Sequence, residues 1–225
     1  MDQESGRPKA LRKGNRRDEI IEVATRCFLD QGYSGTTMSA IFEHVGGSRS
    51  TLYGHFPSKE LLFADVLKFA LRDYRADFQL VLRASNDPRR TLTDFCQRFI
   101  ERLVAPEGIA LQRLIIDATR HFAHVGTVFF EEGPMVTHKL LMDYFVEQNA
   151  AGTLACEDPG EAARLLTSLC TGGLAARVLW DVEQVTPQAV KSDVDQFVGM
   201  FLRFYGRPAA GGLAPATASP VALAK

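Results

Sequence analysis

Hydrogen-bond donors crowd into one short stretch of the chain, directly after a pair of glycines. The residues that follow Gly46 and Gly47 carry hydroxyl, guanidinium, phenol and imidazole groups: Ser48, Arg49, Ser50, Thr51, Tyr53 and His55. Donors of these kinds bind anionic oxygens, whereas catalysis needs a nucleophile beside a base or a metal cage. The chain contains no G-x-S-x-G, H-E-x-x-H, phosphate-loop or dinucleotide-binding pattern. The sequence therefore predicts that the protein is not an enzyme. Two readings of the stretch remain. The protein presents it to an anionic partner, or the stretch is an ordinary helical corner whose polar surface faces water.

The N-terminal region adds positive charge. Residues 7–17 contain six basic side chains and no acidic one, although the whole chain has a formal net charge of −1. The basic residues are Arg7, Lys9, Arg12, Lys13, Arg16 and Arg17. Such an arm is typical of proteins that bind a polyanionic partner, but basic N-terminal tails are also often merely solvated.

The composition of the chain indicates a globular protein that can bury a core, with 46% hydrophobic and 24% charged residues in 225. No apolar run reaches the roughly 18 residues of a membrane span, and no secretory signal opens the sequence. Four cysteines, Cys27, Cys96, Cys156 and Cys170, lie far apart and in or beside apolar stretches. They are predicted to be buried free thiols of a cytoplasmic protein, not disulfides or zinc ligands.

Helices must position the donors, because apolar residues recur at helical spacing almost throughout the chain. The pattern predicts an all-α fold of about nine to ten helices. Thr37, Ser48 and Ser58 are placed to cap three of them, and Gly46 can adopt the positive φ of a tight corner. Two short helices joined at the glycines, after a supporting helix that ends at Gly32, form a helix-turn-helix. In that motif the second short helix enters the DNA major groove.

Residues 16–67 resemble the DNA-binding domain of the TetR family of bacterial transcription regulators. The resemblance rests on Phe28 with GY at 32–33, TTM at 36–38, Ile41, TLYGHF at 51–56 and SKELLF at 58–63. It implies that Arg49 and Ser50 read base edges. It also implies a set of further DNA contacts: Thr36, Thr37, Ser48, Thr51, Tyr53, His55 and Lys59, with Arg16 and Arg17 beside the basic arm. For Tyr53 a half-buried packing role, and for Lys59 a solvated charge, remain open.

The chain departs from the family pattern at Phe42, Val45 and Gly47, where the family usually has Ala, Ala and Val. We hypothesise that Phe42 fills the space vacated at Gly47, so that restoring Val at position 47 destabilises the domain.

The expected layout has four parts: a basic arm (1–15), the helix-turn-helix domain (16–67), a helical effector-binding and dimerisation domain (68–206) and a disordered Ala/Pro/Gly tail (207–225). ALQRLIIDATRHF and FFEEGP give the third part a resemblance to AefR-like C-terminal domains. Two apolar or small-residue stripes suit a homodimer interface: Ala163, Cys170 and Gly173, and Val194, Phe197, Phe201 and Phe204. Alternatively, both stripes pack inside one subunit.

Apolar and aromatic residues in this third part suggest a pocket for a small apolar or aromatic effector. The candidate lining is Phe99, Leu103, Leu114, Asp117, His121, Phe122, Phe130, Met142, Phe145 and Trp180. Asp117, His121 and His124, spaced as on one helical face, could bind a metal, but polar pocket or surface roles are favoured and no cofactor is expected.

Together these features predict a dimeric repressor that effector binding releases from a palindromic DNA operator. The alternatives are an activator, or a small-molecule-binding protein whose DNA-binding domain is vestigial.

Overall fold

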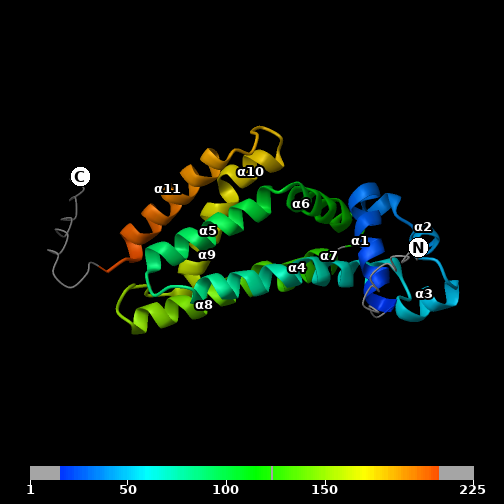
Figure 1. The fold of residues 1–225 in the computed structure, drawn as a ribbon, viewed down its shortest axis with the longest axis horizontal. Helices are drawn as coiled ribbons and strands as arrows, with labels where there is room; N and C mark the ends of the chain where they lie inside the picture. Colours follow the sequence, from blue (N-terminus) through cyan, green and yellow to red (C-terminus); the bar gives the residue numbers. More distant parts are fainter. Residues whose placement is uncertain (1–15, 123, 208–225) are drawn as a thin grey trace, which may run out of the picture. The chain divides into compact units, whose positions relative to one another are not determined.

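The computed structural model describes residues 16–122 and 124–207, and in this part of the chain every regular element is a helix (Figure 1). The helices are α1 (Arg16–Gly35), α2 (Met38–Val45), α3 (Arg49–His55), α4 (Lys59–Arg83), α5 (Pro88–Val104), α6 (Pro106–Thr119), α7 (His124–Glu132), α8 (Pro134–Ala150), α9 (Pro159–Gly172), α10 (Leu174–Leu179) and α11 (Pro187–Tyr205). The all-α prediction is confirmed. The basic arm and nearly all of the Ala/Pro/Gly tail lie outside the described residues.

Capping side chains determine where several helices begin. The Oγ1 atoms of Thr37 and Thr186 accept the N–H groups of Ala40 and Ala189, both at 3.1 Å. Asp158 accepts the N–H groups of Gly160 and Glu161 at 2.8 and 3.0 Å. Each cap satisfies a backbone donor that the first turn of a helix leaves without a partner. The cap at Thr37 was expected from the sequence and is confirmed.

The chain forms two compact units, each built from two stretches of sequence. Unit 1 comprises residues up to Asp77 together with Ala105–Val136, and unit 2 comprises Phe78–Val104 together with the residues from Thr137 onward. The divisions fall inside α4 and α8, so each of these helices contributes to both units.

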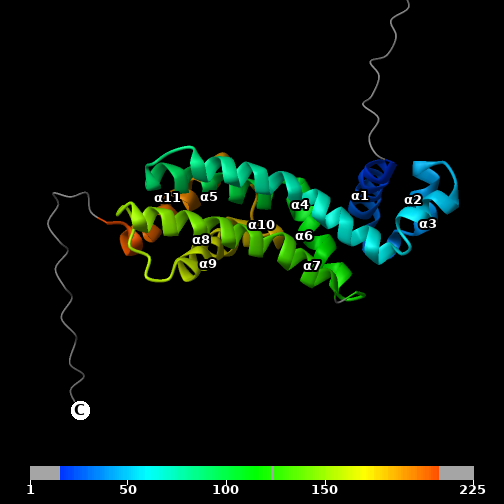
Figure 2. The same ribbon diagram turned by 90° about the horizontal axis from the view of Figure 1, so that it is seen from below.

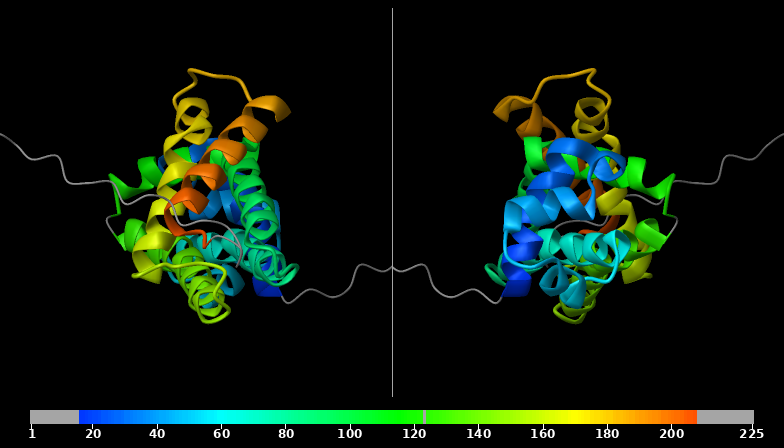
Figure 3. Two further views of the ribbon diagram at one scale, coloured as in Figure 1. Left: turned by 90° about the vertical axis from the view of Figure 1, so that its left-hand side faces the viewer. Right: turned by 90° about the vertical axis from the view of Figure 1, so that its right-hand side faces the viewer.

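Unit 1 packs α1 to α3 and the start of α4 together with α6 and α7 around one apolar core. The right-hand view of Figure 3 shows α1 to α3, in blue and light blue, gathered together. Phe28, Tyr33 and Phe63 form an aromatic cluster at the centre of this core, with ring centroids 4.8 to 5.9 Å apart. Since aromatic side chains bury large areas, this cluster fixes α1 firmly against α4.

Unit 2 packs α5 against α9, α10 and α11. Phe78 lies on Phe95 with ring centroids 5.1 Å apart, and Phe145 stacks on Phe201 at the same separation. All four cysteines of the chain are free and buried, as expected from their apolar surroundings. None of the helices in the described part of the chain is both long and apolar enough to cross a membrane.

Candidate nucleic-acid interface

A glycine corner joins α2 to α3. Gly46 has φ 69° and Gly47 has φ 95°, backbone conformations in which a side chain is strained. The N–H of Gly46 donates to the carbonyl of Phe42 at 2.9 Å, which closes the end of α2. The Oγ of Ser48 accepts the N–H of Thr51 at 3.1 Å, which opens α3. The predicted helix-turn-helix is confirmed, and the positive φ falls on both glycines.

Burial divides α3 into an inner and an outer face. Leu52, inside α3, is 2% exposed, and Phe56, directly after its end, is 1% exposed. Both side chains anchor this segment to the core of unit 1. The outer side chains are exposed: Ser48, Arg49, Ser50, Thr51, Tyr53 and His55. Tyr53 is 48% exposed, so about half of its side chain faces solvent. Within the described residues Arg49 has no hydrogen bond or ion pair, and its guanidinium carbon lies 5.7 Å from the centre of the Phe42 ring. Thr37 is also exposed, at the start of α2.

One predicted DNA contact, Thr36, is wrong, and a second residue, Lys59, is partly engaged, because both side chains serve the end of α1. Thr36 has no exposed surface, and its hydroxyl lies 3.0 and 2.8 Å from the carbonyls of Cys27 and Gly32. The ammonium of Lys59 donates to the carbonyls of Tyr33 and Thr36 at 2.9 and 3.1 Å. These bonds bring side-chain donors to carbonyls in the last turns of α1 and directly after it. A buried hydroxyl cannot reach phosphate, whereas Lys59 is half-buried and has two of its three N–H donors engaged.

Arg16 and Arg17 also make contacts inside unit 1. Arg16 donates to the carbonyls of Val45, at 3.3 Å, and Gly46, and it pairs with Glu19 at 2.6 Å. Arg17 forms an ion pair with Asp65 and lies over Phe56 with its guanidinium carbon 5.2 Å from the ring centre. Both arginines therefore tie α1 to neighbouring elements, a role that the sequence did not indicate.

The space beside Gly47 is occupied by Arg16, not by Phe42. A Cβ atom on Gly47 would lie 2.8 Å from a terminal nitrogen of Arg16, and no atom of Phe42 is among its close neighbours. The hypothesis that Phe42 fills the space vacated at Gly47 is therefore wrong.

The candidate pocket residues divide between the two units. Leu114, Asp117, His121, Phe122 and Phe130 belong to unit 1, and Phe99, Leu103, Met142, Phe145 and Trp180 belong to unit 2. Two of them are too exposed to line a closed pocket, because Phe130 is 52% and Trp180 is 71% exposed. Leu114 is a buried member of the unit 1 core, and Phe122 packs against that core.

A groove of about 370 Å³ opens in unit 2 between the C-terminal part of α4 and α8, which run side by side in Figure 2. Its lining consists of Gln79, Leu82, Arg83, Leu140, Asp143, Tyr144, Val146 and Glu147, none of them in the predicted set. The Tyr144 hydroxyl is buried and makes no hydrogen bond of ordinary geometry. Burial raises the pKa of Tyr144 to about 12, although the nearby Thr91 hydroxyl acts in the opposite direction. Tyr144 therefore stays protonated at neutral pH.

The possible metal ligands are not on one helix. α6 ends at Thr119 and α7 begins at His124, so Asp117, His121 and His124 fall on two helices and the turn between them. No group of three potential ligands comes together anywhere in the described residues.

Most of the residues assigned to the dimer interface are buried within one chain. Ala163, Cys170, Val194, Phe197 and Phe201 are between 0% and 6% exposed. Gly173 faces its own chain, because a Cβ atom there would overlap the Asp193 carboxylate and the Phe197 ring. For these six residues the alternative is correct, and the stripes pack inside the subunit. Phe204 alone of the set is exposed, at 78%.

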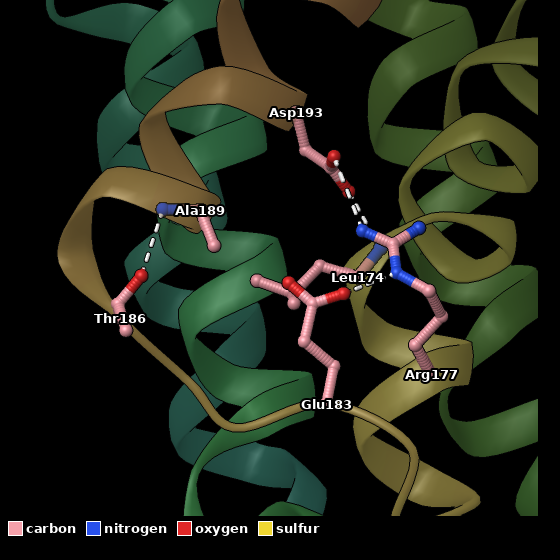
Figure 4. Close-up of polar contacts among 6 residues, drawn as sticks. All are labelled: Leu174, Arg177, Glu183, Thr186, Ala189 and Asp193. Carbon is pink, nitrogen blue, oxygen red and sulfur yellow. Dashed lines mark hydrogen bonds and ion pairs between the residues drawn. The ribbon is translucent and has the colours of Figure 1, made fainter.

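A buried carboxylate on α11 explains why Gly173 must lack a side chain. Asp193 is 8% exposed and accepts the N–H of Leu174, the first residue of α10, at 2.5 Å (Figure 4). Arg177 lies 3.8 Å from Asp193 and donates to Glu183 at 2.6 Å. The Glu183 hydrogen bond raises the pKa of Arg177. Asp193 thus clamps the break between α9 and α10. In the sequence, the signal for this role was an acidic residue directly before the predicted apolar stripe that begins at Val194.

Comparisons with known proteins agree with this geometry. Residues 20–66 match the family described as "Bacterial regulatory proteins, tetR family", and residues 90–207 match the "AefR-like transcriptional repressor, C-terminal domain". The HTH-type transcriptional repressor AcnR of Corynebacterium diphtheriae is 30% identical over 161 residues, which cover 61% of this chain and 82% of AcnR.

Two solved structures share the fold over most of their length. A TetR-family transcriptional regulator from Mesorhizobium loti superposes with a TM-score of 0.80 at 26% identity, covering 85% of this chain and 97% of that one. The flavonoid-responsive regulator FrrA superposes with a TM-score of 0.74 at 30% identity, covering 86% and 98%.

Proposed function

The chain belongs to the TetR family of bacterial transcription regulators, and on this premise we propose that it is a dimeric, cytoplasmic repressor released from its operator by an effector. The observation that carries the proposal is the exposed start of α3, where Arg49 is not engaged in any hydrogen bond or ion pair among the described residues.

On this proposal the outer face of α3 divides its contacts between bases and backbone. Arg49 and Ser50 read base edges, and Arg49 can donate two hydrogen bonds to the O6 and N7 atoms of guanine. A second group of residues holds phosphates and sets the register: Thr37, Ser48, Thr51, Tyr53 and His55. Two copies related by a two-fold axis would read half-sites about one helical turn apart.

The dimer forms, on this proposal, through the outer surfaces of α9 and α11. Leu165 on α9 is 38% exposed and Phe204 on α11 is 78% exposed. Gly172 and Gly199 lie on the same two helices and have open space where a side chain would be. Exposed apolar residues and glycines with open space beside them allow two helices to approach closely, and these outer surfaces replace the buried stripes that the sequence suggested.

The effector is proposed to be a small apolar or aromatic molecule that binds in the helical body, residues 68–206. FrrA, a similar protein, is described as flavonoid-responsive, which favours the aromatic class. Of the candidate lining residues in unit 2, Phe99, Leu103 and Met142 are half-buried and remain candidates. Phe145 is fully buried against Phe201 and is the least suited to meet a ligand.

The long helix α4 is the proposed route from effector to DNA, because it contributes residues to both units. Effector binding would tilt α4 and move the two α3 helices away from operator spacing. The effector shifts this equilibrium only by its difference in affinity for the two states. A coupling of about 1–3 kcal/mol would lower operator affinity roughly 5- to 150-fold.

A gel-shift experiment with the full-length protein tests the proposal. The probe is duplex DNA from upstream of the protein's own gene, and the variants are Arg49→Ala and the control Arg26→Ala. Arg26 is an exposed arginine on α1 of the same unit. Loss of a bidentate base contact predicts about a 5- to 150-fold weaker complex for Arg49→Ala, equivalent to about 1–3 kcal/mol. Arg26→Ala should change affinity less than about threefold.

Equal losses in the two variants would show that Arg49 contributes only charge. A wild-type protein that forms no complex would favour the alternative of a small-molecule-binding protein whose DNA-binding domain is vestigial. A reporter gene under the same DNA decides between repressor and activator, and addition of flavonoids to that reporter tests the effector class.

A further inference from the structure

We infer that Phe42 is a positioning residue for DNA recognition, whose ring holds the Arg49 guanidinium ready to donate to a base edge. The inference rests on the proposed role of Arg49 as a reader of bases. It goes beyond that role because it assigns part of the specificity to a residue on α2 that need not touch DNA.

The geometry of the pair carries the inference. Phe42 lies on α2, and its side chain is partly buried against the core of unit 1. The guanidinium carbon of Arg49, the first residue of α3, lies over the Phe42 ring at 5.7 Å from its centre. A cation within about 6 Å of an aromatic face is attracted by the ring quadrupole. The pair therefore links the two helices of the motif across their glycine corner.

Phe42 is itself held in place. The carbonyl of Phe42 accepts the N–H of Gly46 at 2.9 Å, and Arg16 on α1 donates to the carbonyls of Val45 and Gly46 at the same end of α2. Neither glycine of the corner offers a side chain that could support Arg49, and the space beside Gly46 is open. Among the described residues, the ring is therefore the one partner that Arg49 has by hydrogen bond, ion pair or cation–π contact.

A ring suits this task better than a carboxylate would. Arg16 and Arg17 have carboxylate partners, Glu19 and Asp65, that occupy their N–H groups. An arginine held by an aromatic face keeps its in-plane N–H donors free, and these donors match the O6 and N7 acceptors of guanine. Arg49 thus combines a restrained position with unoccupied donors, which lowers the entropy lost when it binds a base.

A double-mutant cycle tests the inference with the full-length protein. The probe is the duplex that the wild-type protein selects from a library of randomised double-stranded DNA. The variants are Phe42→Leu, which keeps apolar packing but removes the ring, Phe42→Tyr, which keeps the ring, and Arg49→Ala. Phe42→Leu should weaken binding about two- to fivefold in the Arg49 protein, the usual effect of an exposed cation–π pair. It should have no effect on binding in the Arg49→Ala protein, and Phe42→Tyr should bind like the wild type.

A second measurement separates positioning from a general loss of structure. Selection from the same library with Phe42→Leu should relax the base preference at the position that Arg49→Ala also relaxes. The dependence of affinity on salt should stay the same, because no phosphate contact is lost. If Phe42→Leu does not fold, Phe42→Met replaces it.

Equal losses from Phe42→Leu with and without Arg49, or an unchanged base preference, would overturn the inference while leaving Arg49 as the reader. If Arg49→Ala itself leaves the preference intact, or if the wild-type protein selects no sequence, the proposed function fails and the inference fails with it.

Discussion

Gly47 has two separate reasons to lack a side chain, and both can be tested by adding one methyl group. Its φ is 95°, and a Cβ atom would lie 2.8 Å from a terminal nitrogen of Arg16. Gly47→Ala should therefore lower the free energy of unfolding by about 1–2 kcal/mol from backbone strain, and Gly47→Val by more. Part of the loss arises because Arg16 must leave the carbonyls at the end of α2. Denaturant unfolding measures both variants.

The matched control for Gly47 is Gly54, a second glycine of the same motif. Gly54 lies inside α3, its φ is not positive, and no atom lies within 4 Å of the place where a Cβ would be. Gly54→Ala should raise the free energy of unfolding by up to about 1 kcal/mol, because glycine weakens a helix. A Gly47→Ala protein that is as stable as the wild type would show that neither the strain nor the Arg16 contact matters.

Residue type and spacing identified the outer face of α3 but did not separate binding cations from structural ones. Arg49 was correctly placed on the exposed face, whereas Lys59 and Arg16 serve helix ends elsewhere in unit 1. The carbonyl partners of Lys59 lie 23 and 26 residues away, and those of Arg16 lie 29 and 30 residues away. Partners at such separations are set by tertiary packing, which one sequence does not reveal. Phe42 did stand out in the sequence, because the TetR family usually has Ala at this position.

The short helix α10 depends on a tertiary contact, since it has no capping side chain of its own. Asp193 supplies that contact by accepting the Leu174 N–H. Asp193→Ala should lower the free energy of unfolding by about 2–3 kcal/mol, the usual range for a buried hydrogen bond to a charged group. Asp195→Ala is the control, because Asp195 is an exposed neighbour on α11 that pairs only with Lys191. Its removal should cost no more than about 0.5 kcal/mol. Thermal unfolding measures both variants. If Asp193→Ala lowered stability no more than Asp195→Ala does, Asp193 would not clamp α10.

The sequence predicted the helices closely, but it did not predict which other helices each of them packs against. Caps at Thr37, Ser48, Asp158 and Thr186 and the break at Gly133 were all predictable, because each acts through neighbours within a few residues. The stripe from Val194 to Phe201 correctly indicated one apolar face of α11. Spacing alone could not say whether that face meets a second subunit or α5 and α9 of the same chain, because both present equally apolar surroundings.

The uneven charge of the chain leads us to expect that the N-terminal arm contributes to DNA binding. The chain has a formal net charge of −1, and three of the cations first assigned to DNA, Arg16, Arg17 and Lys59, are engaged within unit 1. We therefore expect electrostatic attraction to the duplex to depend on Arg49 and on the basic residues before position 16. Each phosphate that a cation neutralises makes the logarithm of affinity fall by about 0.9 per logarithmic unit of salt.

Replacing Arg7, Lys9, Arg12 and Lys13 by Gln should therefore flatten the salt dependence of operator binding by at most about 3 to 4 units of slope. Affinity should fall most at low salt, while the base preference set at α3 should not change, because phosphate contacts carry no sequence information. The control exchanges Arg7 and Arg12 for Lys and Lys9 and Lys13 for Arg, which keeps the charge and should keep the slope. Fluorescence anisotropy across a salt series measures both proteins. An unchanged slope in the Gln variant would mean that the arm stays in solvent, and the attraction would then have to arise from the helix-turn-helix face itself.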